Sequence, residues 1–320
     1  MKNFIVAVDL GGTQIRSALC SVEGKILKRD ARQTAPIGTE TAFSRIVVSI
    51  RTVVDDWSDV RAIGICAPGP LDPWQGIVLE APNLPGMDGF PLKASLEKEF
   101  GVPAFVGNDA NVAALGECRY GAGRGARSMI YITLSTGIGG GIVDDGKLFL
   151  GWRGFAGEVG HQTIDVNGPV CNCGNVGCLE VMAAGPAIVR DVREALRAGR
   201  ESKIRAMVNG DLDKITGVII TQAAQAGDAL AREIYARAGR YYGFGLVNLL
   251  HNFDTQLFVL GGSVAVHAWD FIYPTMIDVL DKHSFKSMRQ GVQVVRAQLG
   301  DDVGLLGAAA LANESMANGE

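Results

Sequence analysis

A repeated pattern is the feature that most constrains the fold of this chain. Residues 3–22 contain an apolar strand, a glycine turn with a threonine, and a second apolar strand (NFIVAVDL, GGT, then IRSALCSV). Residues 128–151 repeat this order as SMIYITL, STGIGGG and IVDDGKLFLG, with a tight turn expected at Asp145-Gly146. A pattern that restarts almost halfway along 320 residues predicts two α/β domains rather than one core.

The remaining segments extend this alternation of strands and helices. Further strands are expected at 61–67, 103–107, 256–263 and 292–298, and helices at 39–57 (with Thr39 as N-cap), 108–117, 183–198, 215–226, 228–252 and 302–317. The last helix carries Gly304 and Gly307 on one side, which permits close packing onto the first domain. We therefore expect a small α/β domain from residues 1–118 with 302–320, and a large one from residues 119–301.

Composition and charge point to a small ligand. Acidic residues exceed basic ones by 34 to 30, and no Lys/Arg run is long enough for a nucleic-acid or anionic-membrane patch. No apolar run could span a bilayer, and Phe4–Val8 offers only five apolar residues before Asp9, too few for a signal peptide. We expect a cytoplasmic chain with reduced thiols, no nucleic-acid partner and no membrane partner.

A histidine and three cysteines are concentrated in the segment GEVGHQTIDVNGPVCNCGNVGCLE, residues 157–180. Two alternatives to a metal site are a disulfide and ordinary buried thiols. The other three cysteines, which lie in or beside apolar runs, fit the second alternative: Cys20, Cys66 and Cys118. The 171–178 cluster has Asn, Gly and Pro neighbours, which form loops rather than cores. One imidazole and three thiolates predict a structural Zn²⁺ site, flanked by two glutamates.

Three glycine-rich turns can present backbone N–H groups to phosphate: Gly11 to Thr13, Ser135 to Gly141, and Gly261 to Ser263. No GxxxxGK[ST] motif occurs, so a Walker-type NTPase is excluded. The first turn leads into a strand rather than a helix, which does not fit a Rossmann fingerprint. Two matched hairpins in the two halves favour a nucleotide bound between the domains.

A candidate catalytic acid lies in Asn108-Asp109-Ala110-Asn111, where a strand meets a helix. One interpretation is an N-cap, because Asn and Asp are favoured at that position. The other is a general base: Asp109, held by its asparagine neighbours, would take the proton of a substrate hydroxyl during phosphoryl transfer. The two interpretations are compatible, because a helix N-terminus stabilises a carboxylate.

Together these motifs resemble the ROK family of bacterial sugar kinases and repressors, within the actin/hexokinase-like ATPase superfamily. The matching segments cover most of the chain in the family's order: AVDLGGTQIR (7–16), APGPLD (67–72), NDANVAALGE (108–117), LSTGIGGGIV (134–143), GEVGH (157–161), CNCGNVGCLE (171–180) and LGG (260–262). Within the family the chain is most similar to the glucokinases. The resemblance implies a two-domain actin-like ATPase (ribonuclease H-like) fold with a cleft between the domains and a structural zinc loop.

The resemblance also implies an activity, ATP-dependent phosphorylation of the 6-hydroxyl of glucose, with Asp109 as general base. The implied sugar contacts are Asn83, Asn108, Asp109, Glu158, His161 and Glu180. The implied ATP and Mg²⁺ positions are Asp9, Gly11, Gly12, Thr13, Thr136, Gly137, Gly261 and Gly262. The implied zinc ligands are His161, Cys171, Cys173 and Cys178.

Three positions depart from the family pattern. Gly107 stands where many relatives carry Glu, Gln14 where Lys is common, and Met87-Asp88 where glucokinases often have Trp. The resemblance places Met87-Asp88 beside the sugar. Other hexoses are therefore alternative substrates: N-acetylmannosamine, N-acetylglucosamine, mannose or fructose.

The alternatives from other classes are a sugar-responsive repressor, a non-catalytic sugar sensor and a kinase that uses polyphosphate. The first strand begins by Asn3 and the chain is acidic, which argues against a preceding DNA-binding domain. A homodimer or homotetramer is expected from the resemblance.

Overall fold

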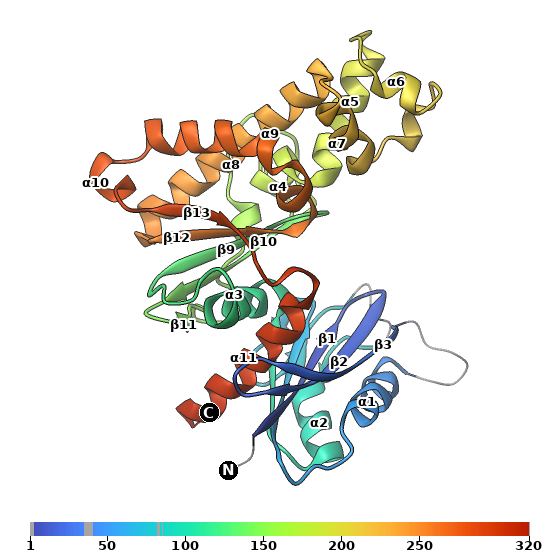
Figure 1. Ribbon diagram of the computed structural model, residues 1–320, viewed down its shortest axis with the longest axis vertical. Helices are drawn as coiled ribbons and strands as arrows, with labels where there is room; N and C mark the ends of the chain where they lie inside the picture. The colour runs from blue at the N-terminus through green and yellow to red at the C-terminus, as the bar shows by residue number, and fades with distance from the viewer. Residues whose placement is uncertain (1–2, 35–40, 82–83, 85, 320) are drawn as a thin grey trace. The chain divides into compact units, whose positions relative to one another are not determined.

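The computed structural model describes residues 3–34, 41–81, 84 and 86–319. The chain forms two compact units (Figure 1). Unit 1 contains Met1–Tyr131, Gly141–Gly157 and Ala297–Glu320, and unit 2 contains Ile132–Gly140 and Glu158–Arg296. These boundaries differ from the expected division at residues 118 and 302, because residues 119–131 and 141–157 group with unit 1.

A five-stranded sheet forms the centre of unit 1. Its order is β3 (Ile26–Gln33), β2 (Gln14–Ser21), β1 (Phe4–Leu10), β4 (Val60–Ala67) and β8 (Ala104–Asn108). The pairs β1–β2 and β2–β3 are antiparallel, whereas β1–β4 and β4–β8 are parallel. Successive side chains of β1 enter different clusters, Val6 and Val8 on one face and Ile5 and Ala7 on the other. Both faces of the sheet are therefore covered.

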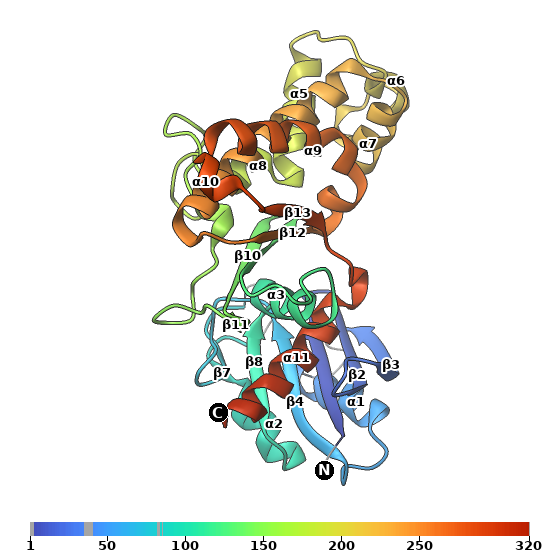
Figure 2. The same ribbon diagram turned by 60° about the vertical axis from the view of Figure 1, so that its left-hand side comes forward.

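Two pairs of helices cover these faces. Helices α1 (Ala42–Val53) and α2 (Leu92–Phe100) bury their apolar side chains on one face, and α3 (Asp109–Tyr120) and α11 (Val303–Asn318) on the other (Figure 2). A Cβ on Gly64 of β4 would lie 1.9 Å from the Ala308 carbonyl oxygen, and one on Gly307 would lie 2.1 Å from the Val112 carbonyl oxygen. The prediction that the C-terminal helix packs closely onto the first domain is confirmed.

A small sheet follows β4 in unit 1. It is antiparallel, with β6 (Ile77–Val78) between β5 (Leu71–Asp72) and β7 (Phe90–Pro91). Met87 is buried in the unit 1 core, and Asp88 Oδ1 accepts a hydrogen bond from the Ala81 N–H at 2.6 Å. The departure at 87–88 therefore has a local structural role, closing the loop between β6 and β7.

The second sheet repeats the topology of the first. Its order is β11 (Lys147–Leu148), β10 (Ile138–Asp144), β9 (Met129–Leu134), β12 (Leu257–Gly261) and β13 (Gln293–Arg296). In both sheets the order is third, second, first, fourth and fifth strand along the chain, which agrees with the repeated sequence pattern. The outer part of β10 groups with unit 1 because it packs on α3: a Cβ on Gly141 would lie 2.6 Å from Ala114 Cβ.

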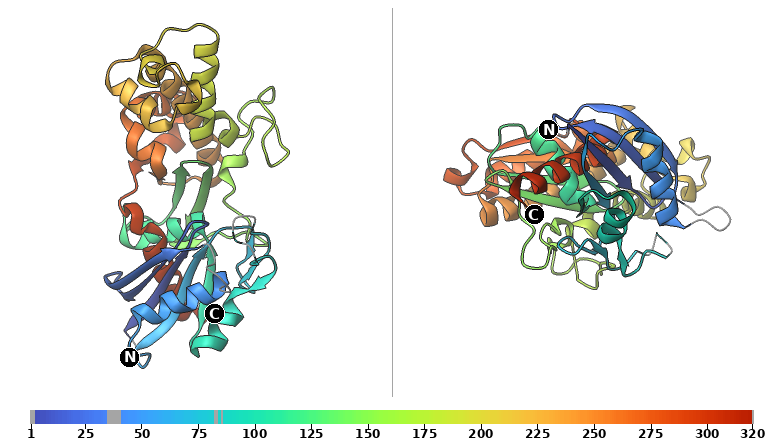
Figure 3. Two further views of the ribbon diagram at one scale, coloured as in Figure 1. Left: turned by 90° about the vertical axis from the view of Figure 1, so that its right-hand side faces the viewer. Right: turned by 90° about the horizontal axis from the view of Figure 1, so that it is seen from below.

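Helices make up most of unit 2 (Figure 3). They are α4 (Leu179–Ala183), α5 (Gly185–Arg197), α6 (Ile204–Met207), α7 (Gly217–Gln225), α8 (Ala229–Phe253), α9 (Gly262–His283) and α10 (Lys286–Arg289). Short 3₁₀ turns lie at Val159–His161 and Leu212–Lys214 in this unit, and at Gly300–Asp302 in unit 1. Helix α8 approaches α9 through two glycines, Gly239 and Gly243. In the part of the chain that the structure describes, no helix combines the length and apolarity that crossing a membrane requires.

Several elements differ from their predicted form. Helix α1 begins at Ala42 and is capped by Thr41, whose side chain accepts the Ser44 N–H, so the cap predicted at Thr39 is wrong; Thr39 itself lies outside the described residues. The second glycine turn is short, because β10 already begins at Ile138. The third glycine-rich segment, Gly261 to Ser263, does not form a separate turn, because helix α9 begins at Gly262 directly after strand β12. Strand β3 and helices α2 and α9 were not predicted.

Candidate functional site

The predicted catalytic pair stands where β8 meets α3 in unit 1. Asn108 has extended backbone angles (φ −64°, ψ 146°) and its side-chain oxygen accepts the Ala110 N–H at 3.1 Å, so it is the N-cap. Asp109 occupies the first helical position, is solvent-exposed, and also accepts from the Ala110 N–H at 2.7 Å. Helix α3 therefore presents a carboxylate at its positive end, where an ionised acid is stabilised.

A second carboxylate lies at the end of β1. Asp9 Oδ2 accepts two hydrogen bonds from the Arg16 guanidinium, one of them at 3.1 Å, and Arg16 also donates to the Asp301 carbonyl oxygen at 2.7 Å. The Cys66 thiol at the end of β4 lies near both acids: burial raises its pKa well above the usual value, and the charges of Asp9 and Asp109 raise it further. Asp9 is thus a fixed, paired acid within unit 1.

The first glycine turn connects β1 to β2. The Gly11 N–H donates to the Gln14 carbonyl oxygen at 2.9 Å, and the Thr34 hydroxyl donates to the Gly11 carbonyl oxygen at 2.6 Å. Gly12 and Thr13 are exposed at the tip. Their N–H and hydroxyl groups face solvent, so this turn can present donors to an anion. Gln14, the departure from Lys, is exposed beside it.

The second glycine turn, Ser135 to Gly137, is held by unit 2. Glu180 Oε2 accepts the Ile138 N–H at 2.9 Å, and the Gly185 N–H donates to the Ser135 carbonyl oxygen at 2.8 Å. A Cβ on Gly137 would lie 2.7 Å from Glu180 Oε2, so a larger residue there would displace the Glu180 carboxylate. Glu180, predicted to contact sugar, therefore also supports the turn beside Thr136.

A cavity of about 570 Å³ opens beside this turn in unit 2. Three helices begin at its wall, at Gly185 (α5), Gly217 (α7) and Gly262 (α9), where backbone N–H groups favour anions. Gly262 has φ +85°, and a Cβ there would lie 2.5 Å from the Leu134 carbonyl oxygen, so glycine is required at this junction. The cavity is therefore suited to a phosphorylated ligand.

Other side chains of this cavity were not predicted as site residues. Ser135 and Ser263 place their hydroxyl oxygens 3.1 Å apart, and the deeper wall has amide, hydroxyl, imidazole and apolar groups: Pro186, Val189, Val218, Thr221, Gln222, Gln225, Tyr235, Val264 and His267. Single residues of this kind carry no motif. The available signal is Gly185-Pro186, which indicates the start of a helix shortly after the cysteine cluster. It predicts one wall of the cavity but no residue that binds a ligand.

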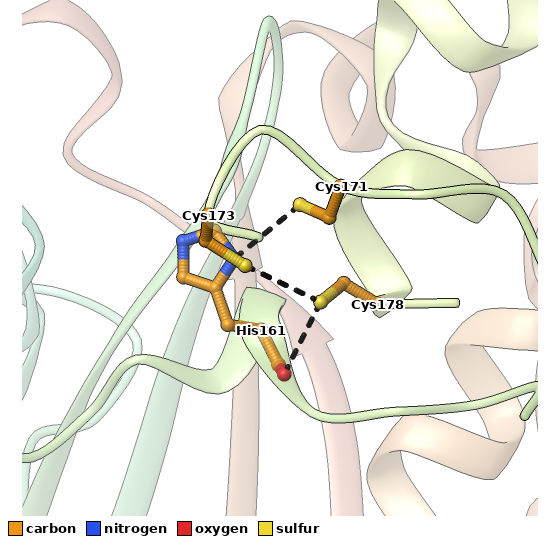
Figure 4. A group of neighbouring side chains, drawn as sticks. All are labelled: His161, Cys171, Cys173 and Cys178. Atoms are coloured by element: carbon orange, nitrogen blue, oxygen red, sulfur yellow. Dashed lines mark hydrogen bonds between the residues drawn. The ribbon is translucent and has the colours of Figure 1, made fainter. Parts of the chain in front are cut away.

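The predicted metal ligands converge in unit 2 (Figure 4). Ligand atoms of His161, Cys171, Cys173 and Cys178 all lie within 4.8 Å of one another. The Cys173 and Cys178 sulfurs are 3.7 Å apart, and Cys171 Sγ is 3.8 Å from His161 Nδ1. A tetrahedral zinc with bonds of about 2.3 Å to sulfur requires sulfurs about 3.8 Å apart. The four side chains therefore fit a zinc ion.

Local structure fixes this cluster. The Cys171 N–H donates to the Asn175 carbonyl oxygen at 2.7 Å, and a Cβ on Gly177 would lie 1.7 Å from the Asp165 carbonyl oxygen. Burial, followed by the neighbouring thiols, raises the pKa of Cys178 to about 12. Because a bound cation displaces thiol protons, the cluster's donors are suited to holding one.

The cluster is directly connected to the predicted sugar contacts of unit 2. His161 turns Nδ1 toward Cys171 and Nε2 toward Glu158, whose Oε2 is 3.9 Å away. Cys178 is the N-cap residue of α4, and Glu180 lies in the first turn of that helix. An ion at the cluster would therefore orient His161 and Glu180 together. Asn83, the remaining predicted contact, lies outside the described residues.

Comparison with known proteins gives matches along nearly the whole chain. The model of the ROK family matches residues 5–315. A glucokinase of Thermotoga maritima is 35% identical over 311 residues, covering 97% of each chain. A xylose repressor of Caldicellulosiruptor bescii is 30% identical, covering 98% of this chain and 78% of the repressor. A solved ROK glucokinase from Streptomyces griseus, in complex with glucose and AMPPNP, is 37% identical with a TM-score of 0.79, covering 97% and 99%.

Proposed function

Since this chain belongs to the ROK family, with its actin-like α/β fold, we propose that it is an ATP-dependent kinase acting on the 6-hydroxyl of glucose. The observation that carries the proposal is Asp109: an exposed carboxylate on the first turn of α3, directly after the cap Asn108. A base in this position can reach a bound hydroxyl. Similarity to a glucokinase crystallised with glucose and an ATP analogue supports the choice of substrates.

The chemistry that we propose is direct phosphoryl transfer. Asp109 accepts the proton of the sugar 6-hydroxyl while that oxygen forms a bond to the γ-phosphorus. The bond from the γ-phosphorus to the β,γ-bridging oxygen breaks, and ADP leaves with the electron pair. The resemblance assigns the sugar contacts to Asn108, Glu158, His161 and Glu180.

For the phosphoryl donor we propose ATP, bound in the 570 Å³ cavity of unit 2. Its size suits a nucleoside, and the amides of Gln222 and Gln225 can hydrogen-bond a base, which polyphosphate lacks. The resemblance assigns further N–H and hydroxyl donors for the phosphates to Gly12, Thr13, Thr136, Gly137, Gly261 and Gly262.

Two metals belong to the proposal. Mg²⁺ would neutralise phosphate charge, and the resemblance assigns its protein donor to Asp9, a single acid paired with Arg16. One carboxylate fits the usual mode of Mg²⁺, which is held mainly by water and nucleotide phosphates. Zn²⁺ at His161, Cys171, Cys173 and Cys178 would be structural, because protein atoms fill all four positions.

The experiment that tests the proposal is ADP release from Mg-ATP with glucose, mannose, fructose, N-acetylglucosamine and N-acetylmannosamine. We expect the highest kcat/KM with glucose. Preference for another sugar would agree with the proposed phosphoryl transfer but reject glucose as the substrate.

The repressor relatives make sugar sensing the second candidate function. Sugar binding by calorimetry without turnover of any sugar would favour that candidate over a kinase.

A further inference from the structure

We propose that unit 1 carries a second ligand site, a cavity of about 320 Å³ beside strand β8, for a small organic anion with a flat apolar body. Strand β8 is an edge strand of its sheet. The cavity lies between this edge, the β5–β6 hairpin, residues 148–154 and helix α11, and all its lining residues belong to unit 1.

A buried amide inside the cavity wall lacks a partner. Asn111 is only 4% exposed, and among the described residues nothing hydrogen-bonds its Oδ1. A buried polar atom without a partner costs about 1–3 kcal/mol, so such atoms are normally satisfied by protein, water or ligand. This oxygen has less than 1 Å² of accessible surface, so it marks an incompletely satisfied wall of the cavity and is not itself a contact for the ligand.

A cation stands at another part of the wall. The Lys93 ammonium lies 5.4 Å from the centre of the Phe105 ring, a cation–π contact. Within residues 3–34, 41–81, 84 and 86–319, no carboxylate forms an ion pair with Lys93. A half-buried ammonium beside an apolar cavity favours an anionic ligand. A carboxylate is suitable, because its oxygens accept charge-assisted hydrogen bonds from the Lys93 ammonium.

The rest of the wall is mainly apolar. Trp74 borders the cavity and is 54% exposed. The cavity is also lined by four leucines: Leu71, Leu148, Leu150 and Leu311. An exposed indole gains contact area when a flat ring packs on it. A volume of about 320 Å³ is near the lower limit for ligand pockets, so the occupant is small.

Gly107 keeps one side of the cavity free of side chain. A Cβ there would lie 2.6 Å from Val112 Cγ2, so the packing of α3 on β8 excludes a larger residue without rearrangement.

The cavity is next to the catalytic pair without including Asp109. Asn108 and Asn111 both line it, and both belong to the first turn of α3 or its cap. An occupant would therefore contact the turn that carries the proposed base. Binding itself does not rest on the proposed function, and it is measured without turnover.

The test is isothermal titration calorimetry of the whole protein with two probes. Indole-3-acetate has the ring and the carboxylate, whereas indole lacks the carboxylate. We expect indole-3-acetate to bind about tenfold more tightly than indole, the usual effect of one hydrogen bond to a charged group. Equal affinities for the two probes, or no binding by either, would overturn the proposal.

Variants locate the binding. Lys93→Met should weaken indole-3-acetate about tenfold and leave indole unchanged, and Trp74→Ala should weaken both. Lys98→Met, on the same helix but outside the cavity wall, is the matched control and should change nothing. Far-UV circular dichroism verifies that each variant is folded. Equal effects of Lys93→Met and Lys98→Met would reject this cavity as the site.

Discussion

The two sheets have the same strand order, yet their first hairpins are supported differently. In unit 1 the turn after β1 is exposed at Gly12 and Thr13, and the acid before it, Asp9, is paired with Arg16 of the same hairpin. In unit 2 the turn after β9 is held from outside the hairpin, by Glu180, which follows the cluster of His161 and three cysteines along the chain. One strand pattern thus supports two different sites, because the chemistry comes from the segments inserted around it.

The inserted segments differ in kind. In unit 1 the strand–helix junction carries the candidate base, and its cap is built from neighbouring residues of the chain. In unit 2 the loop 157–180 has little regular structure, so it depends on four side chains meeting at one point. We therefore expect changes in unit 1 to affect the chemical step and changes in the loop to affect ligand affinity.

Asp109→Asn should produce the largest effect. The amide cannot accept the hydroxyl proton, so kcat should fall at least about 10²-fold. Sugar affinity should survive, because asparagine keeps a polar oxygen in place. ADP release measures the first quantity and calorimetry the second, with Asp55→Asn on the surface as control. Turnover close to that of the unsubstituted enzyme would contradict the role of Asp109.

Cys173→Ala should have the largest effect among changes in the loop of unit 2, and this effect should be on ligand affinity. Removing one of four ligands should release zinc, and sugar affinity should fall about 10–100-fold because His161 and Glu180 lose their support. Metal content by atomic absorption and sugar titration measure both effects. Cys20→Ala removes a buried thiol outside the cluster and should retain the metal. A metal-free Cys173→Ala protein with unchanged sugar affinity would refute the link between ion and sugar.

Ser263→Ala should have a smaller, selective effect. It removes one hydroxyl of the Ser135–Ser263 contact at the start of α9, in the proposed ATP cavity. The loss of one hydrogen bond of about 1 kcal/mol should raise the KM for ATP about fivefold and leave the KM for sugar unchanged. Steady-state kinetics with each substrate varied in turn would distinguish this from a general loss of activity.

Asp30→Asn should affect stability and not catalysis. Hydrogen bonds from Arg32 and then Ser49 lower the pKa of Asp30 below its unfolded value. Its stabilising contribution is therefore complete above the unfolded pKa and is lost as pH falls through the folded pKa. The substitution should cost about 1 kcal/mol in urea unfolding at pH 7 and less near pH 3. A penalty that does not depend on pH would contradict the ionic origin.

Much of the fold follows from local pattern. Strands β1, β4 and β9 are continuous apolar runs between turn residues, so their sequences predict them well. Strand β3 was missed because it is an edge strand whose exposed face carries alternating charges, ILKRDARQ. Helix α9 was missed because Gly261-Gly262 reads as a turn and Pro274 interrupts the pattern.

The sequence by itself determined the repeated strand–turn–strand pattern, the candidate metal ligands and the position of the candidate base, because each depends on residues close together along the chain. Tertiary structure alone decided the Glu180 support of the second turn and both cavities. These depend on side chains brought together from distant segments: His267 and Gln222 reach one cavity, and Lys93 and Asn111 the other. Such encounters follow from packing, which local sequence patterns do not encode.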